Sequence, residues 1–264
     1  MAPQPQPTVS PTPLPAPAGA GRDATVATRT ARTVRSYGSE NTSDGEWPLL
    51  AKIAGSAIVI WFTLSTIAGA LNPGYSPIRE AMSALAATDA DYAWVAITGF
   101  MIAAVGLACT GIVLWRRFAG NRTGRVAATL VTLAAPEMVV AGLARQDCSE
   151  RLPTCIDYGD APLASTHFWV HQYTALFMFV SMTVALFLLA RALRRDAGRA
   201  RLATPTRLVA FTCLAVIVVV FMAEIGSSWH GLIQRIFAAL VFGWPVVVAG
   251  SAPKPQVPGD VVGR

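Results

Sequence analysis

The chain has 264 residues, of which 53% are hydrophobic and only 14% are charged, and its net charge is +6 at pH 7. This composition lies outside the range of a soluble domain of this length, so the sequence predicts a membrane-embedded protein. The basic residues are nearly all arginines in short stretches between apolar segments, a pattern that excludes nucleic acid as the expected partner. The guanidinium of arginine binds phosphate and carboxylate groups through two parallel hydrogen bonds, so membrane lipids are the partners that we expect.

Residues 1–46 are rich in Pro, Thr, Ala and Ser and contain hardly any large apolar residue. No packed core can offset the ordering entropy of such a segment, and it lacks the apolar run of a secretory signal peptide. We therefore expect a disordered cytoplasmic tail here, and a second, short cytoplasmic tail at residues 252–264.

Residues 47–251 contain six apolar segments, each near the ~20 residues with which a helix crosses the hydrocarbon core. The segments are continuous apolar runs without the alternation of a membrane β-barrel. The predicted fold class is therefore all-α, a polytopic bundle of six transmembrane helices. The predicted spans are Leu49–Leu71, Tyr92–Trp115, Val126–Ala144, His167–Ala190, Leu208–Ser228 and Leu232–Ser251.

Arginine is concentrated in two of the connections between these spans. Residues 116–125 contain four arginines and residues 191–207 contain six. The positive-inside rule therefore places these two connections and both termini in the cytoplasm. Three connections remain for the outer side, at residues 72–91, 146–166 and 227–231.

The first outer connection opens with turn residues and then has the pattern of a short helix. Ser76 is a good cap and Pro77 suits the first helical position. Apolar residues recur at helical spacing after them, which favours a helix lying in the outer membrane interface. Its polar residues then face either solvent or a polar cluster: Arg79, Glu80 and Ser83.

The second outer connection contains two cysteines, Cys148 and Cys155. Disulfides persist on the outer side of a cell membrane, so we predict a disulfide between them. A metal site would need further soft ligands nearby, and no other cysteine lies within sequence reach.

His167 and His171 lie one turn apart and share a helix face. This spacing can present two imidazoles to one metal ion, or two hydrogen-bonding groups to neighbouring helices. The pattern of zinc metalloproteases requires a glutamate after the first histidine, and Phe168 stands there instead.

Ionisable residues inside the predicted spans are few, and they include Glu137 beside a proline in the third, Glu224 near the outer end of the fifth, and Arg235 in the first turn of the sixth. An unpaired charge at such a depth costs several kcal/mol, so each should face the bundle interior and find a partner. Glu224 and Arg235 are the natural pair because a short turn separates them.

Most candidate polar residues thus converge at one depth on the predicted outer side. We treat them as one candidate binding cluster, with Glu137 as a separate intramembrane acid. The predicted cluster is Arg79, Glu80, Ser83, Arg145, Asp147, His167, His171, Glu224, His230, Gln234 and Arg235.

Three stretches carry a family likeness: Asn72–Leu85, the Cys148–Cys155 loop followed by His167, and Gly231–Phe237 before Trp244. With them the chain resembles the six-helix prokaryotic membrane proteins grouped as domain-of-unknown-function family 998, over about residues 47–250. The resemblance implies a multi-pass protein of the prokaryotic plasma membrane. The positions that match the family's short motifs are Ser76, Pro77, Arg79, Glu80, Ser83, His167, Gln234 and Arg235.

The sequence leaves several functions open and assigns no reaction, catalytic residue or cofactor. One hypothesis is a protein that binds a lipid headgroup, a small ligand or a membrane-protein partner at the outer cluster, where arginine and histidine suit an anionic group. The alternatives are a metal-dependent membrane hydrolase with His167, His171 and His230 as ligands, a proton-coupled transporter that uses Glu137, and a cluster that only fixes helix packing.

Overall fold

The computed structural model describes residues 46–148, 165–222 and 228–251. Within these ranges the chain is all-helical, and six of its helices are long and apolar enough to cross a membrane, which confirms the predicted fold class and spans. Two short 3-10 helices lie in the connections. The elements are α1 (Glu46–Leu71), η2 (Ser83–Ala86), α2 (Ala93–Arg117), α3 (Arg122–Leu143), α5 (Thr166–Leu193), η4 (Ala200–Leu202), α6 (Ala203–Met222) and α7 (His230–Gly250).

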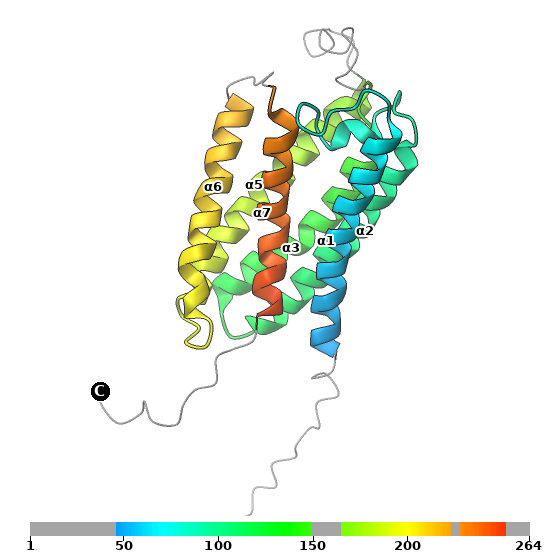
Figure 1. The fold of residues 1–264 in the computed structure, drawn as a ribbon. Coiled ribbons are helices and arrows are strands. Elements are labelled where there is room, and N and C mark those ends of the chain that lie inside the picture. The colour runs from blue at the N-terminus through cyan, green and yellow to red at the C-terminus, as the bar shows by residue number, and fades with distance from the viewer. Residues whose placement is uncertain (1–45, 149–164, 223–227, 252–264) are drawn as a thin grey trace, which may run out of the picture. The chain divides into compact units, whose positions relative to one another are not determined.

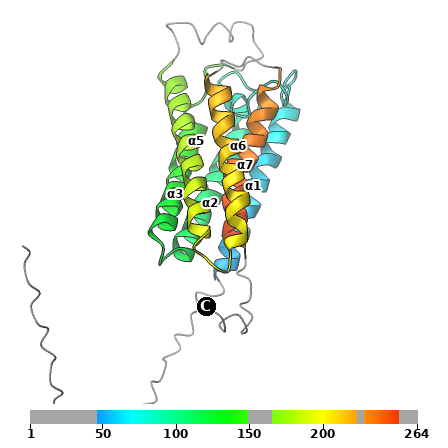
Figure 2. The same cartoon turned by 90° about the vertical axis from the view of Figure 1, so that its left-hand side faces the viewer.

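The six long helices form an up-and-down ring in chain order. Each helix packs against the next one, and α7 closes the ring by packing against α1 (Figure 1). Helix α7 also contacts α2 and α5, which are not its neighbours in the ring, so it lies partly inside the bundle. Figure 2 shows α3 and α5 on one side of the bundle and α1 on the other.

The outward faces of the helices are apolar. Large side chains such as Val59, Tyr173, Phe177 and Leu208 are more than half exposed on this surface. Water would not tolerate so much contiguous apolar surface around a whole bundle, whereas lipid tails would. The chain is therefore a multi-pass membrane protein.

Small residues allow α2 to lie close to both of its neighbours. A Cβ on Gly106 would lie 2.7 Å from the Cβ of Ala57 on α1, and one on Gly111 would overlap Thr132 on α3. Membrane helices gain little from hydrophobic exclusion, so close backbone approach of this kind is a main source of their packing energy.

The two ends of the bundle differ in composition. Residues 116–122 and 194–202 lie at the end where α1 begins and α7 ends, and we call this the arginine end. The opposite end contains residues 72–92 and 144–148, and we call it the pocket end (Figure 1). With six spans, the first and last helices necessarily have their free ends on the same side.

The connection between α1 and α2 differs from the predicted interfacial helix. A short helix is present, but it is a single 3-10 turn, and all four residues of η2 are buried against α1 and α2. Residues 80–87 are buried without a break because the segment folds over the end of the bundle rather than along the membrane surface. We call residues 76–88 the roof segment.

Candidate functional site

The roof segment is fastened on one side to the first turns of α7. The backbone N–H of Leu232 donates to the carbonyl of Ile78 at 3.0 Å, and the backbone N–H of Met82 donates to Oε1 of Gln234 at 2.6 Å. The guanidinium of Arg235 donates to three backbone carbonyls, those of Pro77 at 2.7 Å, Glu80 at 3.0 Å and Gly231 at 2.9 Å, and to the Tyr75 hydroxyl. Residues about 150 positions apart in the sequence are thereby held together.

The opposite side of the roof segment is fastened to the end of α3. Arg145 donates through Nε to the carbonyl of Ala86 at 2.9 Å and through Nη2 to the carbonyl of Ala87. Gln146 donates from its side-chain amide to Ser83 Oγ at 3.2 Å, and the backbone carbonyl of Gln146 accepts from the backbone N–H of Thr88 at 2.9 Å. The roof segment is thus a bridge from α7 to α3.

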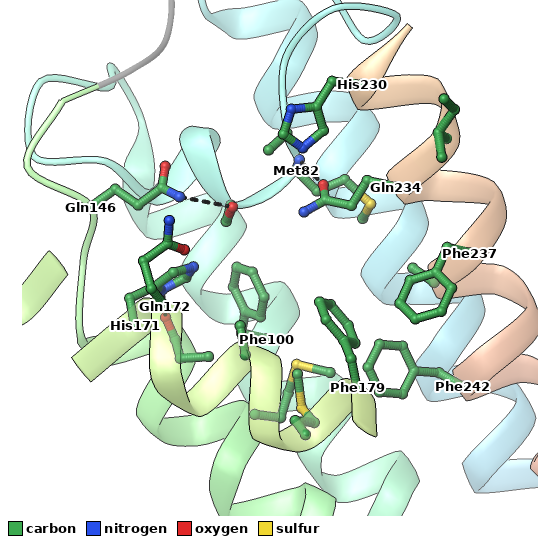
Figure 3. Close-up of a pocket in the computed structure, with 18 of the residues that line it drawn as sticks. Met82, Phe100, Gln146, His171, Gln172, Phe179, His230, Gln234, Phe237 and Phe242 are labelled. Carbon is green, nitrogen blue, oxygen red and sulfur yellow. Dashed lines mark hydrogen bonds between the residues drawn. The ribbon is translucent and has the colours of Figure 1, made fainter. Parts of the chain in front are cut away.

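Beneath this bridge lies a cavity of about 280 Å³ between the helices (Figure 3). Its lower part is apolar, with the rings of Phe100, Phe179, Phe237 and Phe242 in the floor and Phe179 edge-on to Phe237. The upper part is polar, and the polar side chains belong to the roof segment, the end of α3, α5 and α7. These are Ser83, Gln146, His171, Gln172, His230 and Gln234.

His171 on α5 is buried, and its hydrogen bonds fix its orientation. Nδ1 lies 2.8 Å from the carbonyl of Ala141 and 3.0 Å from that of Ala144 at the C-terminal end of α3. Because a carbonyl only accepts, Nδ1 must carry the proton. In the neutral ring, Nε2 is then an acceptor that none of the described residues uses.

Several other polar atoms at the cavity are unused within the described part of the chain. Gln172 and His230 make no side-chain hydrogen bond there. The side-chain oxygen of Gln234 accepts from Met82, and its amide N–H groups donate to none of the described residues. The side-chain amide of Gln146 donates to Ser83, and its side-chain oxygen accepts from none of the described residues. The cavity therefore offers both donors and acceptors, and among the described residues its lining side chains carry no charged group apart from the two imidazoles.

The structure brings together part of the predicted cluster. Ser83, His171, His230 and Gln234 line the cavity. The other predicted members have structural positions or lie elsewhere. Arg145, Arg235 and Glu80 support the roof segment, Asp147 accepts from the backbone and hydroxyl of the α5 cap Ser165, Arg79 and His167 are exposed, and Glu224 lies outside the described residues.

The predicted pairing of Arg235 with Glu224 falls on a residue outside the described ones and stays a prediction, while the described partners of Arg235 are mainly backbone carbonyls. At least four oxygen atoms of the chain, three of them carbonyls, surround its guanidinium. Two of these carbonyls, those of Pro77 and Glu80, belong to the roof segment, so the arginine ties that segment to α7 by satisfying backbone acceptors. Every residue has a backbone carbonyl, so the residue types in a sequence do not reveal which carbonyls an arginine will bind.

The three histidines do not form the predicted metal site. No group of three His, Cys, Asp or Glu side chains among the described residues is placed to hold a metal ion, and all three histidines are described. His171 faces the cavity, whereas His167, one turn earlier, is exposed in the first turn of α5. The hydrolase hypothesis thus loses its ligand set.

Glu137 does not face the cavity either. It lies in a shallow groove between α3 and α5 with Pro136, Tyr173 and Phe177, on the outer surface of the bundle. Its neighbour Met138 lines the cavity instead. A proton relay through the bundle interior would need the carboxylate inside, so the geometry gives the transporter hypothesis no support.

The predicted disulfide involves one residue that lies outside the described residues, Cys155. Cys148 is described, at the end of the segment that follows α3. The pairing stays a prediction. Cys109 in α2 and Cys213 in α6 are free thiols.

Sequence reasoning missed two of the polar residues at the cavity, Gln146 and Gln172. Both are uncharged, and a search for ionisable groups in apolar segments passes over them. The signal that could have found Gln172 is its position directly after His171, because glutamine is uncommon in membrane spans and needs hydrogen-bond partners there.

A pair of substitutions at His171 separates its two roles. His171→Leu removes the donor to the two α3 carbonyls, and we expect the free energy of unfolding to fall by about 1 to 2 kcal/mol. His171→Asn keeps an amide N–H near the position of Nδ1 and should recover about half of that loss. Unfolding in mixed detergent micelles measures both. Equal losses would mean that the size of the ring, and not its hydrogen bonds, supports the helix pair.

The fold and the site define a class: a polytopic six-helix membrane protein with a roofed cavity at one end of the bundle. The family model described as "Protein of unknown function (DUF998)" matches residues 56–251, and the chain belongs to this family, as its motifs indicated. No curated protein and no solved structure matches the chain.

Proposed function

We propose that this protein binds an uncharged amphipathic small molecule or lipid in the cavity under the roof segment. The observation that carries the proposal is the set of unused hydrogen-bonding atoms above an aromatic floor, in a space of about 280 Å³. Ligand pockets typically combine an apolar lining with a few convergent polar groups in this way. The polar head of the ligand would lie under the roof, and its apolar part against the phenylalanine rings.

The absence of charge in the described lining favours an uncharged head over the anionic one that the arginines suggested. Arg145 and Arg235 face the roof segment, where their donors are used by backbone carbonyls. Among the described residues, the polar groups that an anionic ligand in the cavity would meet are amides, a hydroxyl and two imidazoles. Desolvating a full negative charge costs far more than such neutral partners return.

We further propose that the protein lies in the prokaryotic cell membrane with both termini in the cytoplasm. The arginines gather at the end of the bundle opposite the cavity, which supports this orientation. The cavity then opens toward the outer half of the membrane. A Cys148–Cys155 disulfide in the connection beside the cavity would fit an oxidising outer side.

A thermal-shift experiment tests the proposed ligand class. The purified chain is heated with 1-decanoylglycerol, decanoate or decylamine, which share a tail length and differ in head charge. We expect stabilisation by the neutral glycerol ester alone, since only its head finds donors and acceptors without desolvating a charge. Stronger stabilisation by decanoate or by the amine would contradict the proposal.

A matched pair of variants locates the binding. Gln172→Leu removes a cavity amide that makes no bond to the described residues, so we expect it to leave the melting temperature unchanged and to weaken the glycerol-ester shift. Thr98→Leu makes a similar change on the exposed face of α2 and should leave the shift intact. Equal responses of both variants would place the binding outside the cavity.

A further inference from the structure

The arginine end of the bundle carries a large excess of positive charge. Residues 115–129 contain four arginines and residues 190–207 contain six, whereas Asp196 is the only carboxylate in these two stretches. That carboxylate is already paired with Arg199 at 2.9 Å. Most of the guanidiniums at this end therefore have no anionic partner in these stretches.

Some of these arginines have a structural role. The guanidiniums of Arg117 and Arg199 both donate to the carbonyl of Ser251, the residue that caps α7 at its C-terminal end. Their donors satisfy a helix end that would otherwise be left open. Arginines of this kind are explained by the fold and need no ligand.

Arg122 and Arg125 are not explained in this way. Their side chains make no hydrogen bond or ion pair with the described residues, and both are exposed. They line a groove of about 540 Å³ with Thr129 on the same face of α3, and with Trp115 at the end of α2. Ala119 and Gly120 form the turn beside it, and a Cβ at Gly120 would meet nothing within 4 Å, so the groove is open there.

The tryptophan holds one of the two guanidiniums in place. Arg125 lies over the ring of Trp115 at 4.3 Å from the ring centroid. A cation over an indole face keeps its N–H edge available for an acceptor. The ring itself lies at the end of a membrane span, where tryptophan marks the boundary between lipid tails and headgroups.

We propose that this groove binds the phosphate group of an anionic phospholipid. The two forked guanidiniums match the phosphate oxygens, while the lipid's chains run along Trp115 and Val126 toward the hydrocarbon core. The positive-inside orientation places the groove at the cytoplasmic leaflet, where anionic lipids attract basic residues. This site lies at the opposite end of the bundle from the cavity and does not depend on the proposed function.

Native mass spectrometry of the full chain in a non-ionic detergent tests the proposal. Dioleoyl phosphatidylglycerol and dioleoyl phosphatidylcholine are added in parallel; they share their acyl chains, and their headgroups are anionic and zwitterionic respectively. We expect one phosphatidylglycerol to bind per chain at concentrations where phosphatidylcholine does not. Equal retention of the two lipids would overturn the assignment.

Two double variants that lose the same charge give the control. Arg122→Gln with Arg125→Gln should weaken phosphatidylglycerol binding by about tenfold, whereas Arg201→Gln with Arg207→Gln, outside the groove at the same end, should leave it nearly unchanged. Equal weakening in both would mean that net charge alone attracts the lipid, and would overturn the site. Melting curves in phosphatidylcholine show whether each variant is folded.

Two further measurements keep the outcome decisive. The double variant Arg122→Lys with Arg125→Lys keeps both positive charges but loses the bidentate geometry of the guanidinium. We therefore expect its affinity for phosphatidylglycerol to lie between those of the wild type and the glutamine variant. Inorganic phosphate should compete only weakly, because it lacks the chains. If inorganic phosphate binds as tightly as the lipid, the groove is a site for a soluble anion, and the lipid assignment fails.

Discussion

Gly231→Ala should destabilise the protein by about 3 kcal/mol, although alanine is the better helix former. Gly231 is the second residue of α7, and its Cα faces the roof segment. A Cβ there would lie 2.7 Å from the carbonyl oxygen of Pro77 and would overlap that of Glu80. Both obstacles are backbone atoms held by hydrogen bonds to α7, so neither can move without breaking the attachment of the roof segment. Unfolding in mixed micelles measures the loss.

Gly243 on the same helix is the matched control. A Cβ at this position would meet nothing within 4 Å, so Gly243→Ala should leave the protein as stable as before or stabilise it by about 0.5 kcal/mol. The two substitutions are chemically identical and differ only in what faces the glycine. A loss of similar size at both positions would contradict the close contact between α7 and the roof segment.

Arg235→Leu is the second change with a large expected effect, a loss of about 3 kcal/mol in the free energy of unfolding. The substitution removes the donors from the carbonyls of Pro77 and Glu80 and from the Tyr75 hydroxyl. The two carbonyls lose a charged donor that ties the roof segment to α7, which is the costly part of the change. Arg79→Leu makes the same substitution on the same connection, at an exposed side chain, and should change the stability by less than about 0.5 kcal/mol.

Labelling distinguishes loosening of the roof segment from general destabilisation. Ala84 is buried in η2, so a cysteine introduced there should react slowly with a maleimide in the otherwise wild-type chain. In the Arg235→Leu background we expect much faster labelling at a temperature where the helices remain folded. Slow labelling in both backgrounds would show that the arginine does not hold the roof segment closed.

The sequence by itself determined the membrane class, the all-helical fold and the approximate places of the six spans, with the largest offset at the fifth, which begins at Ala203 rather than Leu208. These features depend on quantities that each residue carries locally: its hydropathy, its charge and the length of the run in which it stands. The family likeness also rested on local runs, and the family model confirmed it. Sequence further located four cavity residues, Ser83, His171, His230 and Gln234, because polar residues at one depth in apolar segments need a common explanation.

Only the tertiary structure decided how these residues divide between binding and support. His167 and His171 looked equivalent by spacing, yet His167 is exposed in the first turn of α5, whereas His171, one turn further along, is buried against the end of α3 and faces the cavity. The sequence suggested only a carboxylate partner for Arg235, and the structure adds backbone carbonyls of a segment some 150 residues earlier. A free carbonyl group depends on the path of the chain and not on residue type, so no reading of residue types could have placed the roof segment or the cavity beneath it.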